Sequence, residues 1–151
     1  RAAAGEAAFT ARSLHAGVAE GRLLGGNLTV LAAALGTAHA PLLADSLLFI
    51  EEVHEAPYRL DRLFTQLRQA GVLDQARGVV AGVFDRCQPT DNDPSFTLDG
   101  VVDEHLARLG RPAVYGWSFG HVRDQWTLPL GVMARLDTAT RTLTLLEAAV
   151  S

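Results

Sequence analysis

The sequence predicts an α/β domain, and two observations lead to this prediction. Between residues 46 and 117, short apolar runs alternate with segments whose apolar residues recur at helical spacing. Residues 131–147 then alternate apolar and polar side chains around a turn, which is typical of a β-hairpin. The order strand, helix, strand, helix, strand predicts a parallel sheet with right-handed crossovers. The hairpin and strands near residues 13–24 are expected to form a second, antiparallel sheet.

The first helix is predicted after the segment GGNL. Asn27 is a suitable N-cap, Leu28, Leu31 and Leu35 lie on one stripe, and Gly36 stands just past the end. Two glycines directly before a helix leave backbone amides open to an anion or a carbonyl oxygen, although they also suit a plain tight turn.

A strand buried on both faces is predicted for SLLFIEE, residues 46–52. The helix that follows opens with Pro57 and closes at Gly71, with apolar residues at the i, i+3, i+4, i+7 spacing between them. The segment GVVAGVF, residues 78–84, predicts a second buried strand.

The segment CQPTDNDPSF predicts a loop because it is dense in Pro, Asp and Asn. Thr97 is expected to cap a third helix that Gly110 ends. The apolar stripe of this helix consists of Leu98, Val101, Val102, Leu106 and Leu109. PAVYGW, residues 112–117, predicts the third strand, and the turn of the final hairpin is expected at residues 137–140.

Composition excludes several classes of protein. A chain of 151 residues with 48% hydrophobic and 20% charged residues is typical of one globular domain. The net charge is −4, and the thirteen basic residues are all Arg and scattered, which argues against a nucleic-acid surface. The single Cys87 excludes an internal disulfide and a multi-cysteine metal site.

No apolar run approaches the ~20 residues that span a bilayer, so no membrane contact and a cytoplasmic location are expected. The chain begins at Arg1 and continues through an Ala-rich stretch. Residues 1–12 are therefore predicted to be a linker remnant, and residues 13–151 the domain.

Candidate functional residues follow the predicted strands. Glu51 and Glu52 end the first strand, Cys87 follows the second, and His121 follows the third. In a parallel sheet the carboxyl ends of the strands form the functional crevice. A carboxylate and a histidine side by side there could act as orienter and base for a nucleophile. The competing interpretation is a solvated turn carboxylate and a loop histidine.

The other candidates favour structural roles. Cys87 is expected to be a small apolar residue at a strand end instead of a reactive thiol. His105, on the stripe of the third helix, is expected to be a hydrogen-bonded boundary histidine. The remaining histidines show no metal-type spacing, so no metal site is predicted.

Several blocks in the same order resemble the LD-carboxypeptidases, serine peptidases that include the muramoyltetrapeptide carboxypeptidases and the microcin C self-immunity hydrolases. The blocks are EGRLLGGNLTVLAAALGT, LLFIEEVHEAPYRLDRLFTQLRQAG, GVVAGVFDRC, GWSFGH and TLPLGVMARLD. The resemblance is to the C-terminal domain of the family. It implies a swivelling β/β/α-type α/β domain with a parallel sheet, a second antiparallel sheet and packed helices.

The resemblance also implies a function. Glu51 and His121 correspond to the glutamate and histidine of a Ser-Glu-His triad, and Asn27 and Gly26 to substrate-binding positions. The expected reaction is hydrolysis of the amide bond between an L-diamino acid and the terminal D-alanine of murein tetrapeptide, or of a related L,D-peptide, in cell-wall recycling, without a cofactor. Members of the family are often dimers, so a homodimer is one expected assembly.

This sequence departs from the family pattern in two ways. Glu52 stands where the family commonly has Asp. The family's nucleophilic serine lies on a sharp turn in an N-terminal domain, and Ser118 instead belongs to the strand that leads to His121. The isolated chain is therefore expected to be inactive and to need that N-terminal domain as its partner. The alternatives are a microcin C-type hydrolase of peptide-nucleotide conjugates and a non-catalytic muropeptide-binding module.

Overall fold

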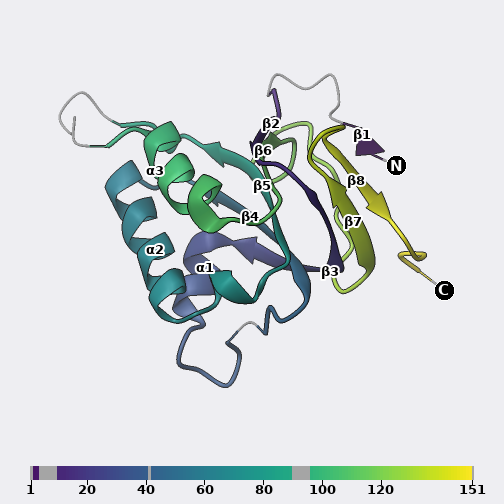
Figure 1. Ribbon diagram of the computed structural model, residues 1–151. Helices are drawn as coiled ribbons and strands as arrows, with labels where there is room; N and C mark the ends of the chain where they lie inside the picture. Colours follow the sequence, from purple (N-terminus) through teal and green to yellow (C-terminus); the bar gives the residue numbers. More distant parts are fainter. Residues whose placement is uncertain (1, 4–9, 41, 90–95, 151) are drawn as a thin grey trace.

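The computed structural model describes residues 2–3, 10–40, 42–89 and 96–150. In these ranges, eight strands form one mixed sheet in the order β1-β8-β7-β3-β4-β5-β6-β2 (Figure 1). The strands are β1 (Ala2–Ala3), β2 (Arg12–His15), β3 (Val18–Asn27), β4 (Ser46–Val53), β5 (Gly78–Asp85), β6 (Ala113–Trp117), β7 (Met133–Asp137) and β8 (Thr142–Leu145). The helices are α1 (Leu28–Ala33), α2 (Pro57–Gln69) and α3 (Leu98–His105), with 3₁₀ turns at Leu73–Gln75 and Ala107–Leu109.

The centre of the sheet is parallel. β4 pairs with β3 on one side and with β5 on the other, and β5 pairs with β6, all in parallel. β4 and β5 are buried along nearly their whole length because helices cover one face and the rest of the sheet covers the other. The α/β class is confirmed, and the three strands predicted from apolar runs are β4, β5 and β6.

Strand β3 joins the parallel and antiparallel parts. Its first half, residues 18–22, pairs antiparallel with β7, and its second half, residues 22–27, pairs parallel with β4. At the other edge, β2 pairs antiparallel with β6. The expected antiparallel strands are therefore present, but they do not form a separate second sheet: they continue the parallel sheet, because β3 is long enough to pair in both ways.

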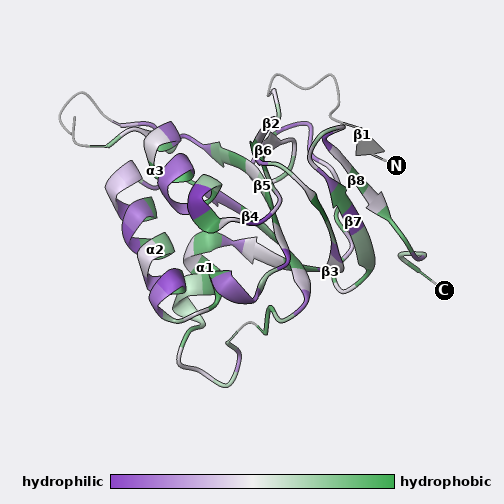
Figure 2. Cartoon of the chain, in the orientation of Figure 1, coloured by the Kyte–Doolittle hydropathy of each residue, from purple (hydrophilic) through white to green (hydrophobic). Residues whose placement is uncertain are grey.

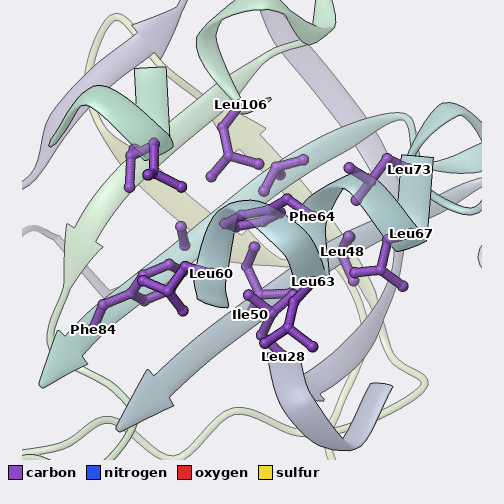
Figure 3. Close-up of a cluster of buried hydrophobic side chains, with 14 of the residues drawn as sticks. Leu28, Leu48, Ile50, Leu60, Leu63, Phe64, Leu67, Leu73, Phe84 and Leu106 are labelled. Atoms are coloured by element: carbon purple, nitrogen blue, oxygen red, sulfur yellow. The ribbon is translucent and has the colours of Figure 1, made fainter. Parts of the chain in front are cut away.

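The curled sheet separates two hydrophobic cores. In Figure 1 the three helices lie to the left of the parallel strands, and β7 and β8 lie to the right. On the helix side, residues of α2 such as Phe64 pack on Ile50 of β4 (Figure 3), while the outer surfaces of α2 and α3 are largely hydrophilic (Figure 2). On the other side, Leu47 and Val80 share a cluster with Leu136 of β7, so the strand pair β7–β8 closes over the parallel strands.

The predicted helix ends are largely confirmed. Asn27 Oδ1 accepts from Val30 N at 3.1 Å, and Thr97 Oγ1 accepts from Gly100 N at 3.1 Å, so both residues are the expected N-caps. Pro57 begins α2, and Gly71 follows its end with a φ of +69°. The hairpin is also confirmed as β7 and β8.

Three local predictions were wrong. Helix α3 ends at His105, and the chain continues through the 3₁₀ turn Ala107–Leu109 before it reaches Gly110. Helix α1 ends at Ala33, before Leu35. Gly25 and Gly26 form the end of strand β3 and not a separate turn, because they pair with Phe49 and with the residue after it in β4. The parallel pairing with β4 therefore overrides the turn preference of the two glycines.

Part of the predicted linker, residues 1–12, lies outside the described residues. Among the residues of this segment that the structure describes, Ala2–Ala3 form β1, which pairs with β8, and Arg12 belongs to β2. None of the helices in the described ranges has the length and apolarity needed to cross a bilayer.

The junction between β3 and β4 has little room for a side chain. Gly25 has a φ of +148°, and a Cβ built on it would lie 1.8 Å from the carbonyl oxygen of Phe49. Gly25→Ala is expected to lower the free energy of unfolding by at least about 3 kcal/mol, since a backbone clash adds to the strain of the left-handed conformation. Urea unfolding followed by circular dichroism measures this.

The neighbouring glycine offers a matched control. Gly26 has a similar φ of +154°, but a Cβ there would meet nothing within 4 Å. Gly26→Ala should cost only the conformational strain, about 1–2 kcal/mol. Equal losses in the two variants would contradict the steric explanation.

Candidate functional site

The two carboxylates at the end of β4 lie in different surroundings. Successive side chains of a strand point to opposite faces of the sheet. Glu51 and Glu52 are both buried, with 8% and 2% of their surface exposed. Each therefore needs its own polar partners, because an unpaired buried carboxylate is costly.

Glu52 holds the beginning of helix α1. Its Oε1 accepts from Asn27 Nδ2 at 2.7 Å and from Val53 N at 2.9 Å, and its Oε2 accepts from Thr29 N at 2.8 Å. The amide of Thr29 belongs to the first turn of α1, where backbone N–H groups lack helical partners. Glu52 is thus a structural carboxylate that ties β4 to β3 and α1.

Glu51 instead pairs with His121, seventy residues later in the chain. Glu51 Oε2 lies 2.8 Å from His121 Nδ1. A carboxylate only accepts, so Nδ1 carries the proton and Nε2 is left as the basic nitrogen when the ring is neutral. The Glu51 side chain is 11% exposed and the His121 side chain 54% exposed, so a buried carboxylate orients a ring that remains accessible.

The chain after β6 must cross β5 to bring His121 to β4. Val83 N of β5 donates to Phe119 O at 3.1 Å, which lays the segment over the end of β5. Gly120 then passes so close to β4 that a Cβ on it would lie 2.8 Å from Glu51 Oε2, at a φ of +113°. A side chain at position 120 would collide with Glu51, so a glycine directly before His121 is required for the Glu51–His121 contact.

A pocket of about 460 Å³ opens beside the Glu51–His121 pair. Its walls are formed by Gly26, Phe49, Glu51, Phe119, Gly120, His121, Val122, Gln125, Trp126 and Leu128. The rings of Phe49 and Phe119 meet edge to face at 6.0 Å, and Trp126 packs on Trp117 at 5.6 Å. The ionisable pair thus stands at one side of a cavity whose walls include three aromatic side chains, a common arrangement for a small-molecule site.

The structure brings three of the four predicted site residues together. Glu51, His121 and Gly26 line the same pocket. Asn27 does not: its Nδ2 donates to Glu52 and its Oδ1 accepts from Val30 N, so both polar atoms of the side chain have local partners. Substrate binding by Gly26 and Asn27 stays a prediction.

Sequence reasoning missed the aromatic walls. Phe49 could have been found, because it precedes Glu51 by two residues and so shares its face of the strand. Phe119 and Trp126 lie in the segment after β6, where no periodicity indicates which way a side chain points.

The remaining candidates have structural partners. His105 is hydrogen-bonded as expected, with its Nε2 2.8 Å from Asp61 Oδ1, but at 3% exposed it is buried and does not lie at the boundary of the core. Cys87 is fully buried, and its thiol donates to the carbonyl oxygen of Asp85 at 3.4 Å. In the described part of the chain, no group of three His, Cys, Asp or Glu side chains is placed to hold a metal ion.

Comparison with known proteins gives consistent matches. Residues 20–136 match the family model of the LD-carboxypeptidase C-terminal domain. A probable murein peptide carboxypeptidase of Bacillus subtilis is 38% identical over 135 residues, which cover 89% of this chain and 42% of that protein. The chain thus spans less than half the length of this curated relative.

Solved structures show the same fold. The crystal structure of muramoyltetrapeptide carboxypeptidase from Oxalobacter formigenes superposes with a TM-score of 0.76 at 34% identity, over 93% of this chain and 50% of that one. The microcin C7 self-immunity protein superposes with a TM-score of 0.80 at 26% identity, over 93% of this chain and 42% of that one.

The adjacent carboxylates provide a test of their separate roles. Glu52→Gln is expected to lower the free energy of unfolding by about 1–3 kcal/mol, because an amide nitrogen replaces an oxygen that accepts from buried N–H groups. Glu51→Gln, which disturbs one contact to a half-exposed ring, is expected to cost less. Denaturant unfolding of both variants measures the difference, and a larger loss for Glu51→Gln would contradict the assignment.

Burial predicts alkaline sensitivity at Cys87. Burial, together with the nearby carboxylates of Glu52 and Glu55, raises the pKa of the thiol from 9.0 to about 11. Below pH 9 the thiol is protonated in both the folded and the unfolded state. Between pH 9 and 11 only the unfolded state releases the proton, so stability falls, by about 2 kcal/mol in all.

Unfolding free energies measured from pH 8 to pH 11 test this expectation. Burial also raises the pKa of Tyr115, to about 12, which adds a similar decline in the upper part of the range. Cys87→Ala retains the tyrosine and should show a shallower decline than the parent protein. Parallel curves for the two proteins would contradict the prediction.

Proposed function

The chain belongs to the LD-carboxypeptidase family, as its C-terminal domain, and from this membership we propose that it supplies the glutamate and histidine of a Ser-Glu-His hydrolase. The proposed reaction is cleavage of the amide bond between an L-diamino acid and the terminal D-alanine of murein tetrapeptide, in the cytoplasmic recycling of cell-wall peptides. The observation that supports it most directly is the 2.8 Å contact between Glu51 and His121 beside a pocket.

The chemistry follows from the tautomer of His121. With Nδ1–H donated to Glu51, Nε2 takes the proton of the serine hydroxyl as the serine oxygen attacks the scissile carbonyl. The resulting imidazolium is stabilised by Glu51 and returns the proton to the nitrogen of the departing D-alanine. Water then enters, gives a proton to Nε2 and hydrolyses the acyl-enzyme, and His121 returns that proton to the serine.

The serine is proposed to come from the N-terminal domain of the same enzyme. The chain covers only 42% of its Bacillus relative, which leaves room for such a domain. Ser118, although close to His121 in the chain, is 4% exposed and donates its hydroxyl to the carbonyl oxygen of Asp124. A buried hydroxyl with this partner is poorly suited to attack a substrate in the pocket.

A second candidate is a hydrolase of peptide-nucleotide conjugates. The microcin C7 self-immunity protein superposes as well as the carboxypeptidase does. The aromatic pocket walls, Phe49, Phe119 and Trp126, would also suit a planar base, since aromatic side chains stack on such groups. Activity on both substrate types, measured side by side, separates the two candidates.

The triad assignment predicts a large loss of activity in two variants of the full-length protein. His121→Ala is expected to lower kcat/KM for D-alanine release from murein tetrapeptide by at least about 10³-fold, because it removes the proton carrier. Glu51→Gln is expected to lower it by about 10²-fold or more, because an amide can hold His121 in the wrong tautomer. Coupled detection of free D-alanine measures both.

Two controls accompany this assay. His39→Ala, which removes an exposed loop histidine, should leave kcat/KM unchanged. The 151-residue chain alone should release no D-alanine, since the serine is proposed to come from another domain. Undiminished hydrolysis by His121→Ala would exclude the triad role. No hydrolysis of either substrate type by the unmodified full-length protein would favour a muropeptide-binding module.

A further inference from the structure

Ser118 lies three residues before His121, and its hydroxyl and its carbonyl oxygen both bond to residues 124–126. The residue is 4% exposed. Its Oγ donates to the carbonyl oxygen of Asp124. Its own carbonyl oxygen accepts from Trp126 N at 2.7 Å. Ser118 therefore closes residues 118–126 into a loop through both its side chain and its backbone.

This loop, which we call the histidine loop, carries His121, Val122, Gln125 and Trp126 of the pocket wall. Near its start it is anchored on β5 by the bond from Val83 N to Phe119 O, and Gly120 passes close to Glu51 of β4. The far end of the loop is held by the two hydrogen bonds that Asp124 and Trp126 make to Ser118, and by the packing of Trp126 on Trp117, whose ring centroids lie 5.6 Å apart.

His121 depends on these anchors. Its side chain is 54% exposed, and its contact with Glu51 fixes the ring at Nδ1. The position of Nε2 therefore depends both on this contact and on the backbone of the histidine loop. A displacement of about 1 Å at a reacting group can cost about 10²-fold in rate.

We propose that Ser118 is a positioning residue of the site, which holds the histidine loop so that Nε2 of His121 and the aromatic wall formed by Trp126 face the same pocket. The catalytic part of this inference rests on the proposed hydrolase function. The structural part, that the Ser118 hydroxyl orders the histidine loop, is independent of that function.

Ser46 provides a matched control. Like Ser118 it is buried, at 0% exposed, and its hydroxyl donates to a backbone carbonyl, that of Leu43, at 2.7 Å. Ser46 begins β4, five residues before Glu51, and is not part of the pocket wall. Ser118→Ala and Ser46→Ala thus remove the same kind of bond from a buried site, and only one of them lies at the histidine loop.

The experiment compares these variants in the full-length protein. Ser118→Ala is expected to lower kcat for D-alanine release at least about 10-fold with a smaller change in KM, since the loop orients a reacting group. Ser46→Ala is expected to leave kcat within about 2-fold, even if its melting temperature falls as much. Equal kcat values in the two variants would overturn the proposal.

Nuclear magnetic resonance of ¹⁵N-histidine-labelled protein provides a readout that does not need activity. The Nδ1–H resonance of His121, in its bond to Glu51, should broaden or exchange faster with solvent in Ser118→Ala and not in Ser46→Ala. If the parent enzyme shows no hydrolysis, the proposed function fails and this signal alone decides the inference. An unchanged signal in Ser118→Ala overturns it. If Ser118→Ala does not fold, Ser118→Cys and Ser46→Cys are compared in the same way, because a thiol is of similar size and a weaker donor.

Discussion

Strand β4 is buried on both faces, so each carboxylate at its end needs polar partners. The contacts that provide these partners connect β4 to helix α1 and to His121. Glu51 and Glu52 follow one another at the end of that strand, so they point to opposite faces. Glu52 accepts from the backbone N–H of Thr29 at the start of α1, and Glu51 pairs with the ring of His121. The same strand end thereby secures a helix on one face of the sheet and a polar pair in the pocket on the other.

The pocket-side contact depends on the order of the strands. β6 is separated from β4 by β5, so a residue after β6 reaches Glu51 only by crossing the end of β5. The bond from Val83 N to Phe119 O supports that crossing, and Gly120 removes the side chain that would collide with Glu51. The Glu51–His121 contact therefore depends on the positions of three parallel strands, β4, β5 and β6.

Much of this could be predicted from the sequence, and the failures have physical reasons. An apolar run indicated β4, and Pro57 with the helical spacing of apolar residues indicated α2. Parallel strand ends meet at one edge, so Glu51 and His121 were expected to be neighbours. The two glycines before Asn27 were not recognised as part of a strand because glycine carries no preference for an extended strand, and only pairing with β4 decides their conformation. Trp126 was missed because its backbone bond to Ser118 leaves no pattern in the sequence.

The Glu51–His121 contact is made entirely by residues of this chain, and so are the contacts that hold the histidine loop. The conformational cost of orienting the imidazole is therefore met when this domain folds, before any other segment or substrate is present. A serine brought by another domain would meet a base whose tautomer and direction are already set. Domain packing would then have to position a single oxygen atom relative to Nε2, which is a smaller demand than assembling three side chains at once.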